Sequence, residues 1–393
     1  MRSTTPKRTH YDAIIVGARC AGSATAMLLA RHGLSVLVLE RSSYGSDTVS
    51  THALMRPAVL QLSRWGVLDD LAAAGTPTIQ HTTFHYGDEE IAIPIKPKEG
   101  VNGLCAPRRT VLDRALVDAA VAAGAEVIFG VTVVDLIRNS YDRVSGVAAR
   151  RNDGGTMSFS ADVVIGADGV RSTVARLAGA ESYHHGRHAT GCVYAYWQGL
   201  EVEGSHWYYR PGSAAGVIPT NDGATCVFVS VSDQRFRSGV RPDIEAGFDR
   251  VLSDCAPSLA ASIGGRRSDS RLKAFAGIKG FFRKSWGPGW ALVGDAGYFK
   301  DPLTAHGISD ALRDAGLLAR AVVDGSDSAL VAYQTNRDYL SWDLFETTDR
   351  IASFRWSLDE LKVLHLDLSE QMNHEADVIL SHGDPRHHLP LSA

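Results

Sequence analysis

The residues with the clearest chemical potential lie near the start of the chain, where residues 17–22 read GARCAG. A loop of this kind binds a dinucleotide when its glycines allow a tight turn after a strand and close packing of the following helix. Free amides at the start of that helix then bind the phosphates. Gly17 and Gly22 fit the first and third glycine positions, whereas Arg19 occupies the second. Arg19 either turns outward and leaves the loop intact, or places its guanidinium near the pyrophosphate.

The surroundings of this loop have the order of a βαβ unit. Residues 12–17 are a short β-rich run, residues 21–31 are helical in pattern, and residues 35–39 are a second buried strand. Glu40 ends that strand, 18 residues beyond Gly22, close to the spacing of a ribose-binding carboxylate. The alternative is a glycine-rich turn beside an ordinary surface glutamate. The combined context favours a nucleotide site.

Two further motifs come later in the chain. Residues 166–172 read GADGVRS and follow another buried strand. Residues 294–297 read GDAG, and Asp301-Pro302 and His306-Gly307-Ile308 follow them. These three motifs, in this order and at these separations, resemble those of the FAD-dependent aromatic hydroxylase superfamily. It includes para-hydroxybenzoate hydroxylase-like (group A) flavoprotein monooxygenases, flavin-dependent halogenases and geranylgeranyl-reductase-like enzymes. The resemblance covers most of residues 10–325.

The resemblance implies a set of FAD-binding positions. Asp295 is similar to the acid that binds a ribityl hydroxyl, and Arg109 to the arginine that reaches the phosphates or the ribityl chain. Asp168 is similar to the acid of a turn that supports the pyrophosphate region. Thr51 is expected beside the flavin ring, and Pro302 on the other side of that ring. The full predicted set is Gly17, Ala18, Ala21, Gly22, Glu40, Arg41, Thr51, Arg109, Val133, Asp168, Gly169, Gly294, Asp295, Pro302, Gly307 and Ile308.

The last motif also has a physical interpretation of its own. A helix that begins near Gly307 directs its free amides and positive dipole end forward. Reduced flavin carries negative charge around N1 and the C2 carbonyl, and a helix end aimed there would stabilise it. The alternative is an ordinary helix that starts at a glycine.

Three side chains are the candidates for catalysis. His52 and His306 belong to motifs that the resemblance places near the flavin, where either could donate a hydrogen bond or act as an acid or base. Asp301 could orient a substrate, although Lys300-Asp301 could also be a solvated ion pair. The pairs His184-His185 and His387-His388 lack the spacing of metal ligands, so no metal site is predicted.

The activity that this resemblance implies is that of a single-component FAD-dependent monooxygenase. It would hydroxylate an aromatic or polycyclic small molecule with O₂ through a C4a-hydroperoxyflavin, with NAD(P)H as the reductant. The aromatic run around Trp197 and 207–209 (WYY) suggests a cavity for such a ligand. No second GxGxxG segment for NAD(P)H is found, which allows either direct reduction or a separate flavin reductase as partner.

Three alternatives remain. Flavin-dependent halogenases carry Trp-x-Trp-x-Ile-Pro, and residues 216–219 (GVIP) match only its Ile-Pro end. Geranylgeranyl-reductase-like enzymes saturate C=C bonds and carry an aromatic-x-Trp-x-Phe-Pro motif, which residues 215–219 again match only in part. The third is a protein that holds FAD without redox turnover.

Composition excludes several other classes of protein. The 393 residues carry 40 basic and 44 acidic side chains, so the basic excess of a nucleic-acid-binding protein is missing. Five widely spaced cysteines form no Cys-x-x-Cys pair, which indicates reduced cysteines. No run of about 18 apolar residues predicts a membrane span, and no signal peptide is recognised. We therefore expect a cytoplasmic protein.

These elements predict an α/β protein with a discontinuous architecture. A Rossmann-like FAD-binding domain is expected from residues 10–78, 101–180 and 285–335. Residues 79–100 and 181–284 are expected to form a smaller, substrate-binding β-sheet domain, because strand-like aromatic runs replace the buried-strand style there. Residues 336–393 are expected to be a helical C-terminal segment.

Overall fold

The first layer of the fold is a largely parallel sheet that the dinucleotide-type loop adjoins. The computed structural model describes residues 6–263 and 270–381. Its eight-stranded sheet has the order β18-β19-β10-β1-β2-β7, with β8 and β9 continuing from β10. The strands are β1 (His10–Val16), β2 (Val36–Glu40), β7 (Glu126–Phe129), β8 (Val131–Arg138), β9 (Val144–Arg151), β10 (Thr156–Gly166), β18 (Trp286–Gly287) and β19 (Trp290–Leu292).

The central strands are apolar because both faces of this sheet are covered. On one face, Ala13 and Ile15 of β1 pack with helices α1 (Cys20–Arg31), α4 (Arg109–Ala122) and α9 (Gly307–Asp324). On the other, Ile14 and Val16 pack with the antiparallel strands β8 and β9. A strand that is covered on both faces needs a continuous apolar run rather than an alternating one, as residues 12–17 predicted.

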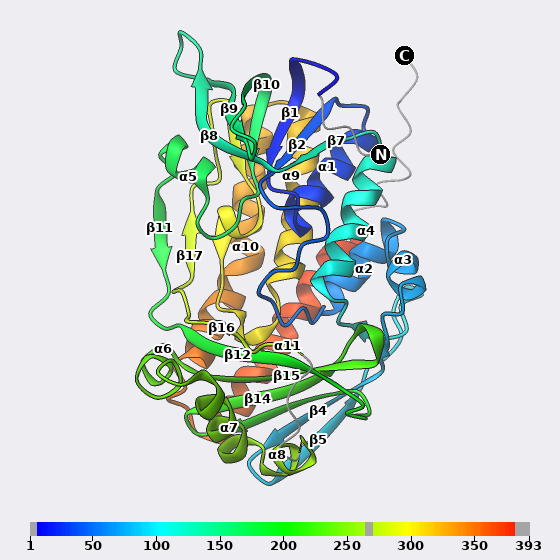
Figure 1. Cartoon of the computed structure of the whole chain (residues 1–393), viewed down its shortest axis with the longest axis vertical. Helices are drawn as coiled ribbons and strands as arrows, with labels where there is room; N and C mark the ends of the chain where they lie inside the picture. Colours follow the sequence, from blue (N-terminus) through cyan, green and yellow to red (C-terminus); the bar gives the residue numbers. More distant parts are fainter. Residues whose placement is uncertain (1–5, 264–269, 382–393) are drawn as a thin grey trace.

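The second layer is a seven-stranded sheet at the other end of the molecule (Figure 1). Its order is β16-β12-β15-β14-β13-β4-β5. Helices α7 (Ile244–Cys255) and α8 (Pro257–Ile263) cover its outer face, and the inner face turns toward the first layer. The strands are β4 (His81–Tyr86), β5 (Glu89–Pro94), β12 (Thr190–Gln198), β13 (Ser205–Arg210), β14 (Ser213–Pro219), β15 (Ala224–Ser232) and β16 (Lys273–Phe275).

Shorter elements connect the two sheets. A three-stranded sheet and a two-stranded pair lie among them, along with short helices before and after the second sheet's strands. The three-stranded sheet has the order β11 (Ser182–His185), β17 (Phe281–Arg283) and β20 (Tyr298–Phe299), and the pair is β3 (Thr78–Ile79) with β6 (Leu104–Cys105). The short helices are α2 (Arg56–Arg64), α3 (Leu68–Ala73), α5 (Thr173–Ala178) and α6 (Asp233–Arg235).

Two long helices complete the described part of the chain. Helix α10 (Asp327–Ala352) packs against α9, and α11 (Leu358–Ser381) packs against α10 and α2. Both run along the length of the molecule, so the C-terminal segment touches the two layers (Figure 1). Among the described residues, no helix combines the length and apolarity that a membrane span requires.

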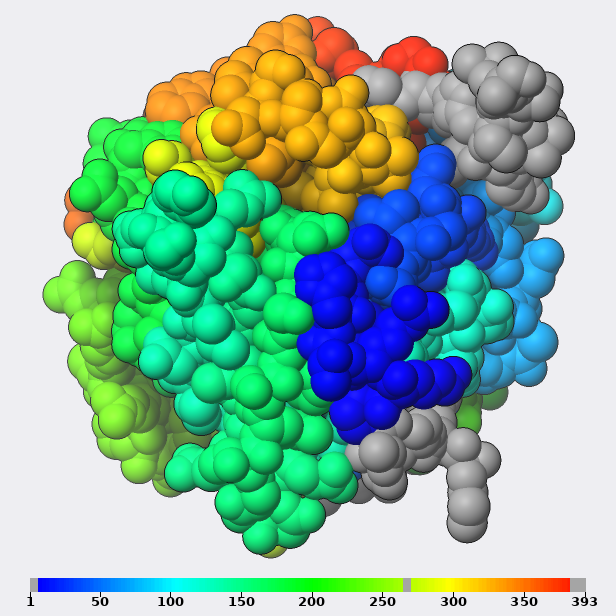
Figure 2. Space-filling view, turned by 90° about the horizontal axis from the view of Figure 1, so that it is seen from above, coloured from blue at the N-terminus to red at the C-terminus, as the bar shows by residue number. Residues whose placement is uncertain are grey.

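The predicted α/β fold with a discontinuous nucleotide-binding layer is confirmed. Seen from above, blue N-terminal residues, the cyan and green residues of the β8–β10 region and orange residues of the later helices share one end of the molecule (Figure 2). Segments that are far apart in the sequence are therefore brought to the same end of the fold.

Candidate functional site

A cavity of about 620 Å³ extends between the two layers. Its walls come from the carboxyl ends of β1 and β2, from residues 48–53, from residues 131–133, from residues 167–173 and from the loop that precedes α9. Strands β12, β13, β15 and β16 close it from the second sheet. Carboxyl ends of parallel strands are where nucleotides bind in doubly wound α/β folds.

Gly17 and Gly22 lie at the end of the cavity where the sequence predicts phosphate binding, which we call the phosphate end. Their lack of a side chain leaves room that any other residue would fill. Gly17 has a φ of +107°, and a Cβ there would lie 2.5 Å from the carbonyl oxygen of Ala167. A Cβ on Gly22 would lie 1.9 Å from the Gly17 carbonyl oxygen. The loop therefore keeps its backbone close to the neighbouring strand and its amides free at the start of α1. This cradle fits a pyrophosphate.

Glu40 closes the loop from the end of β2. It is buried, its Oε2 accepts a hydrogen bond from the Ala18 amide (2.7 Å), and its Oε1 accepts one from the Ser42 amide (2.8 Å). Both carboxylate oxygens keep further lone pairs, and Glu40 and Arg41 line the cavity. Glu40 thus orders the loop and also presents oxygen atoms to the space in which a ribose is expected.

Arg19 leaves the backbone of the loop intact. Its guanidinium donates to the carbonyl oxygen of Ser46 (2.6 Å) and to Oδ2 of Asp113 (2.7 Å). Arg109, from the first turn of α4, donates to the other oxygen of Asp113 at 3.0 Å. Both arginines line the cavity. One buried carboxylate therefore holds two guanidinium groups beside the phosphate loop, an arrangement that the spacing of Arg19 alone did not predict.

The 166–172 motif shapes a second wall of the cavity. Asp168 accepts hydrogen bonds from the Ser172 hydroxyl (2.5 Å) and the Thr173 amide (2.6 Å), and so caps α5. Asp168 and Gly169 line the cavity, as Val133 does from β8. These hydrogen bonds hold the conformation of this loop at the wall of the cavity.

Asp295 lies deeper in the cavity, next to a glycine that the packing requires. A Cβ on Gly294 would approach the Cβ of Ala21 to 2.9 Å. Burial, together with the nearby carboxylate of Asp310, raises the pKa of Asp295 to about 7, although Arg109 opposes this shift. A carboxyl with such a pKa can accept or donate a hydrogen bond near neutral pH, which suits a contact with a hydroxyl group.

The loop before α9 approaches the middle of the cavity. Pro302, Gly307 and Ile308 line it, and Ala305 takes a left-handed conformation with a φ of +53°. Helix α9 begins at Gly307 and runs for 18 residues, so its positive end points at this part of the cavity. The space beside Gly307 is open, which allows a flat ring to approach the backbone.

His52 lines the cavity, but both of its ring nitrogens are engaged. Nδ1 lies 3.0 Å from the carbonyl oxygen of Ala106, and Nε2 lies 2.9 Å from the hydroxyl of Tyr196. Because a carbonyl only accepts, Nδ1 carries the proton and Nε2 accepts from Tyr196. Burial lowers the pKa of His52 to about 3. The imidazole is therefore neutral and serves to position its loop, whose backbone is left-handed at His52 itself (φ of 49°).

The side chains of His306 and Asp301 are turned away from the cavity, which their neighbours Gly307 and Pro302 line. The Asp301 carboxylate accepts hydrogen bonds from the amides of Leu303 (3.0 Å) and Thr190 (2.7 Å), so it joins the loop that precedes α9 to β12. Burial raises its pKa to about 6. Neither side chain is among the described residues that line the cavity.

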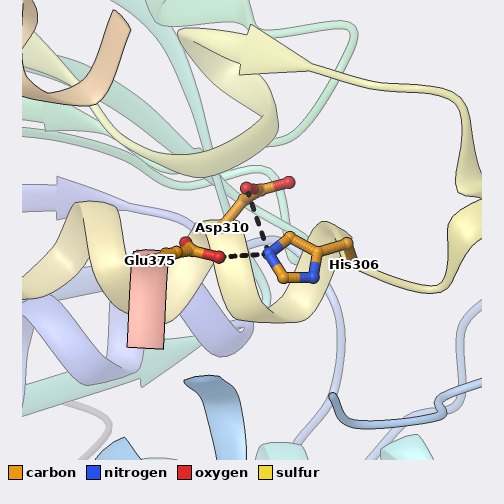
Figure 3. Close-up of side chains that lie close together, drawn as sticks. All are labelled: His306, Asp310 and Glu375. Atoms are coloured by element: carbon orange, nitrogen blue, oxygen red, sulfur yellow. Dashed lines mark hydrogen bonds and ion pairs between the residues drawn. The ribbon is translucent and has the colours of Figure 1, made fainter. Parts of the chain in front are cut away.

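His306 instead belongs to a buried ion network at the start of α9. Its Nε2 lies 2.5 Å from Glu375 of α11 and 3.9 Å from Asp310 (Figure 3). These three side chains could together offer ligands to a metal ion. However, Arg313 contacts Asp310 (3.0 Å) and Glu375 (2.8 Å), and Lys300 contacts Asp310 (3.1 Å). Cationic side chains already neutralise these carboxylates, so we interpret the cluster as an ion network.

The other histidines considered for metal binding have different surroundings. His184 lies 2.8 Å from Glu346 of α10 and packs against Trp342. His387 and His388 lie outside the described residues.

The wall formed by the second sheet is mostly aromatic. Tyr194 of β12, Trp207 of β13 and Phe228 of β15 line the cavity. Of the aromatic residues singled out from the sequence, only Trp207 does so. Trp197 instead faces the outer side of the sheet, where it stacks on Phe248 of α7. Strand alternation at positions 190, 192 and 194 could have identified this wall, but the sequence does not show which side of β12 faces inward.

The comparison with known proteins agrees with this geometry. The family model described as an FAD binding domain matches residues 10–348. The chain belongs to this FAD-binding family. The resemblance to the aromatic hydroxylase superfamily and the prediction of FAD as the cofactor are confirmed. The protein is thus an FAD-dependent oxidoreductase that acts on a small organic substrate.

Its similar relatives differ in activity. The chain is 28% identical over 328 residues to digeranylgeranylglycerophospholipid reductase 1 of Methanococcoides burtonii, covering 80% of this chain and 74% of that protein. It is 28% identical over 334 residues to menaquinone reductase of Mycolicibacterium smegmatis, covering 81% and 77%. Among solved structures, it is similar to PqsL, a probable FAD-dependent monooxygenase from Pseudomonas aeruginosa, with a TM-score of 0.75 and 20% identity over 93% of this chain and 100% of that chain. The last likeness shows the fold.

Proposed function

We propose that this protein is an FAD-dependent reductase that saturates a C=C bond of an apolar organic substrate, with NAD(P)H as the reductant. The observation that carries the proposal is the aromatic wall that the second sheet contributes to the cavity. Tyr194, Trp207 and Phe228 form this wall, opposite the loops where the flavin is expected. Among the described residues, the second sheet contributes no ionised side chain to it. Such a surface suits an unsaturated apolar molecule. The similarity to two reductases supports this choice over hydroxylation, the activity that the motifs first suggested.

The chain would bind the cofactor with the residues that its motifs predicted. Gly17, Gly22 and the start of α1 would take the pyrophosphate, Glu40 the ribose, and Asp295 the ribityl chain. Thr51 and Pro302 would lie on either side of the flavin ring. We retain the predicted division into an FAD-binding domain and a substrate-binding sheet domain as part of this proposal, because it places the ring at their junction.

FAD that NAD(P)H has reduced would supply the hydride in such a reaction, and a proton from water would complete the second C–H bond. The chain's own residues orient the substrate, exclude water from the aromatic wall, and stabilise negative charge through the amino end of α9. His52, His306 and Asp301 act in this proposal as positioning residues. Each one holds a loop that borders the cavity, through Tyr196, Glu375 and Thr190 respectively.

Monooxygenation is the second candidate, and a specific observation favours it. Geranylgeranyl-reductase-like enzymes carry an aromatic-x-Trp-x-Phe-Pro motif. The tryptophan of that motif would stand at position 216 of strand β14, where this chain has glycine, and Val217 occupies the unspecified position that follows. The same segment lacks both tryptophans of the halogenase motif. A dry aromatic cavity over the flavin suits hydroxylation of an aromatic molecule equally well.

Anaerobic titration of the purified holoprotein with NADPH and NADH tests the proposal first. We expect the flavin band near about 450 nm to bleach with one of the two nucleotides. Unsaturated polyprenyl lipids and quinones are then added without O₂, and products are analysed by mass spectrometry. A gain of two hydrogen atoms supports the reductase. A product that forms only with O₂ and gains one oxygen atom supports monooxygenation instead, and bleaching by dithionite alone indicates a partner reductase.

A further inference from the structure

The wall of the second sheet has a polar corner beside its aromatic surface. Alternation along β12 places Thr190, Cys192 and Tyr194 on one face, and all three line the cavity. In the antiparallel register, Cys192 lies directly opposite Ser230 of β15, which also lines the cavity. We call Thr190, Cys192 and Ser230 the polar corner. None of these residues belongs to an FAD motif.

Thr190 has a hydroxyl without a well-formed hydrogen bond. The residue is fully buried and its amide donates to Asp301; its Oγ1 also lies near that carboxylate, but no hydrogen bond of good geometry forms among the described residues. Leaving a buried hydroxyl unpaired costs about 1–3 kcal/mol. Natural proteins keep few such groups, and those that they keep call for an explanation. A ligand oxygen in the cavity would supply the missing partner.

The polar corner carries no charge of its own. Burial raises the pKa of the Cys192 thiol to about 12, and this thiol hydrogen-bonds to Ser230. The Asp301 carboxylate lies next to Thr190. An anionic group would therefore meet neutral donors beside a negative side chain. The described residues of this wall include no arginine or lysine, and Lys300, which lines the cavity from the loop before α9, already pairs with Asp310. The surroundings favour an uncharged oxygen such as that of a carbonyl.

The aromatic surface begins at the next positions along the same strands. Phe228 lies two residues from Ser230 and opposite Tyr194 in the register. The Phe228 ring meets that of Trp207 edge-on at 5.3 Å and covers Gly216, where a Cβ would come within 2.4 Å of the ring. The polar corner and the aromatic surface are thus adjacent, and together they would bind a partly polar molecule in one orientation.

We propose that the polar corner binds an uncharged carbonyl oxygen of the substrate, while Tyr194, Phe228 and Trp207 hold its apolar body. The substrate class is then a quinone or an enone with an apolar substituent. This inference deepens the proposed function and rests on it, because conjugation to a hydrogen-bonded carbonyl is what makes a C=C bond accept a hydride.

Two probes with the same carbon skeleton test the inference without turnover. Duroquinone carries two carbonyl groups, and durene is the corresponding hydrocarbon. Each is titrated into the FAD-loaded protein in its oxidised state, and binding is followed by the change in the flavin absorbance. We expect duroquinone to bind about tenfold more tightly than durene, as one or two hydrogen bonds to neutral groups allow. The double variant T190V/S230A should reduce this preference to within about twofold.

Thr225→Val is the matched control. Thr225 lies on β15 but faces away from the cavity, and its hydroxyl donates to Leu200. This variant should lose stability and keep the preference for duroquinone. T190V alone should lose less stability than T225V, since the Thr190 hydroxyl makes no hydrogen bond of good geometry among the described residues.

Equal affinity for the two probes, failure to bind either one, or an unchanged preference in the double variant would overturn the inference. These measurements use oxidised flavin, so they are independent of whether NAD(P)H or O₂ reacts. A protein that prefers duroquinone but shows no C=C reduction would retain the polar corner and lose the proposed function.

Discussion

The two ends of the cavity are built in different ways. At the phosphate end, backbone amides and glycines make the site, and Gly17, Gly22 and Glu40 come from one continuous βαβ unit. At the substrate end, side chains such as Thr190 and Phe228 make the site, and they come from strands that are joined only through sheet register. Backbone sites tolerate few residue types, whereas side-chain sites can change their ligand by substitution. We therefore propose that the first end holds the FAD cofactor and that the second determines which substrate binds.

The largest effect should come from a side chain added at the phosphate end. Gly22→Val places a Cβ 1.9 Å from the Gly17 carbonyl oxygen, so the loop must shift away from the strand. We expect FAD affinity to fall at least about 100-fold, which corresponds to about 3 kcal/mol. Fluorescence titration of apoprotein with FAD measures this. Gly239→Ala is the control, because its φ is not positive and nothing lies within 4 Å of its Cβ position. If G22V bound FAD as tightly as the wild type, close backbone packing of the loop would not be what binds the cofactor.

The second largest effect should come from the ion network in which His306, at the start of α9, meets Glu375 of α11. Glu375→Gln removes a buried charge that faces His306 and Arg313. We expect the free energy of unfolding to fall by about 3 kcal/mol, as is typical when one partner of a buried pair is removed. Asp377→Asn on the same helix, which breaks only the half-exposed pair with Lys98, should change it by less than about 0.5 kcal/mol. Equal losses in urea denaturation would show that the network adds nothing beyond surface pairing.

The pH dependence of stability should expose the buried state of His52. Its pKa lies near 3 in the folded protein, below its ordinary value of 6.5. Since unfolding lets the ring take up a proton, its contribution to stability is present above pH 6.5 and is lost as the pH falls toward 3. His52→Gln removes this contribution. Between pH 6.5 and 4, wild type should lose on the order of 2 kcal/mol more than the variant. Parallel pH profiles for the two proteins would contradict a neutral, buried His52.

The smallest effect should be confined to the substrate end. Phe228→Leu removes an aromatic face from the cavity and should weaken duroquinone binding about tenfold, with FAD affinity unchanged. Trp197→Leu, on the opposite face of the same sheet, should lower stability through lost packing against Phe248 and leave both affinities unchanged. If Phe228→Leu weakened FAD binding as strongly as duroquinone binding, the two ends of the cavity could not be separated.

Most of the residues that the sequence predicted for the cofactor end line one cavity, and the reason is local. A strand, a glycine loop, a helix and a second strand within about 30 residues can pack in one way. The structure accordingly brings Gly17, Glu40 and Asp295 to one cavity. The Arg19 alternatives could not be separated from the sequence, because its partner Asp113 lies on α4.

The substrate end was predicted less well. Trp207 lines the cavity as expected, whereas Trp197 points to the other side of its sheet. Thr190, Cys192 and Ser230 carried no signal of function, because short polar residues in a strand have many uses. His306 was a candidate for catalysis in the sequence, but its neighbour Gly307 reaches the cavity while the imidazole turns toward Glu375.

The amino-acid sequence alone determined the FAD-binding family, the parallel sheet and the phosphate loop, since these depend on glycine spacing and on apolar runs that act over short stretches of chain. The tertiary structure decided which face of β12 borders the flavin side, which carboxylate Arg19 meets, and how α11 reaches His306. These outcomes depend on strand register and on contacts across more than 60 residues of sequence, and local residue preferences carry no information about either.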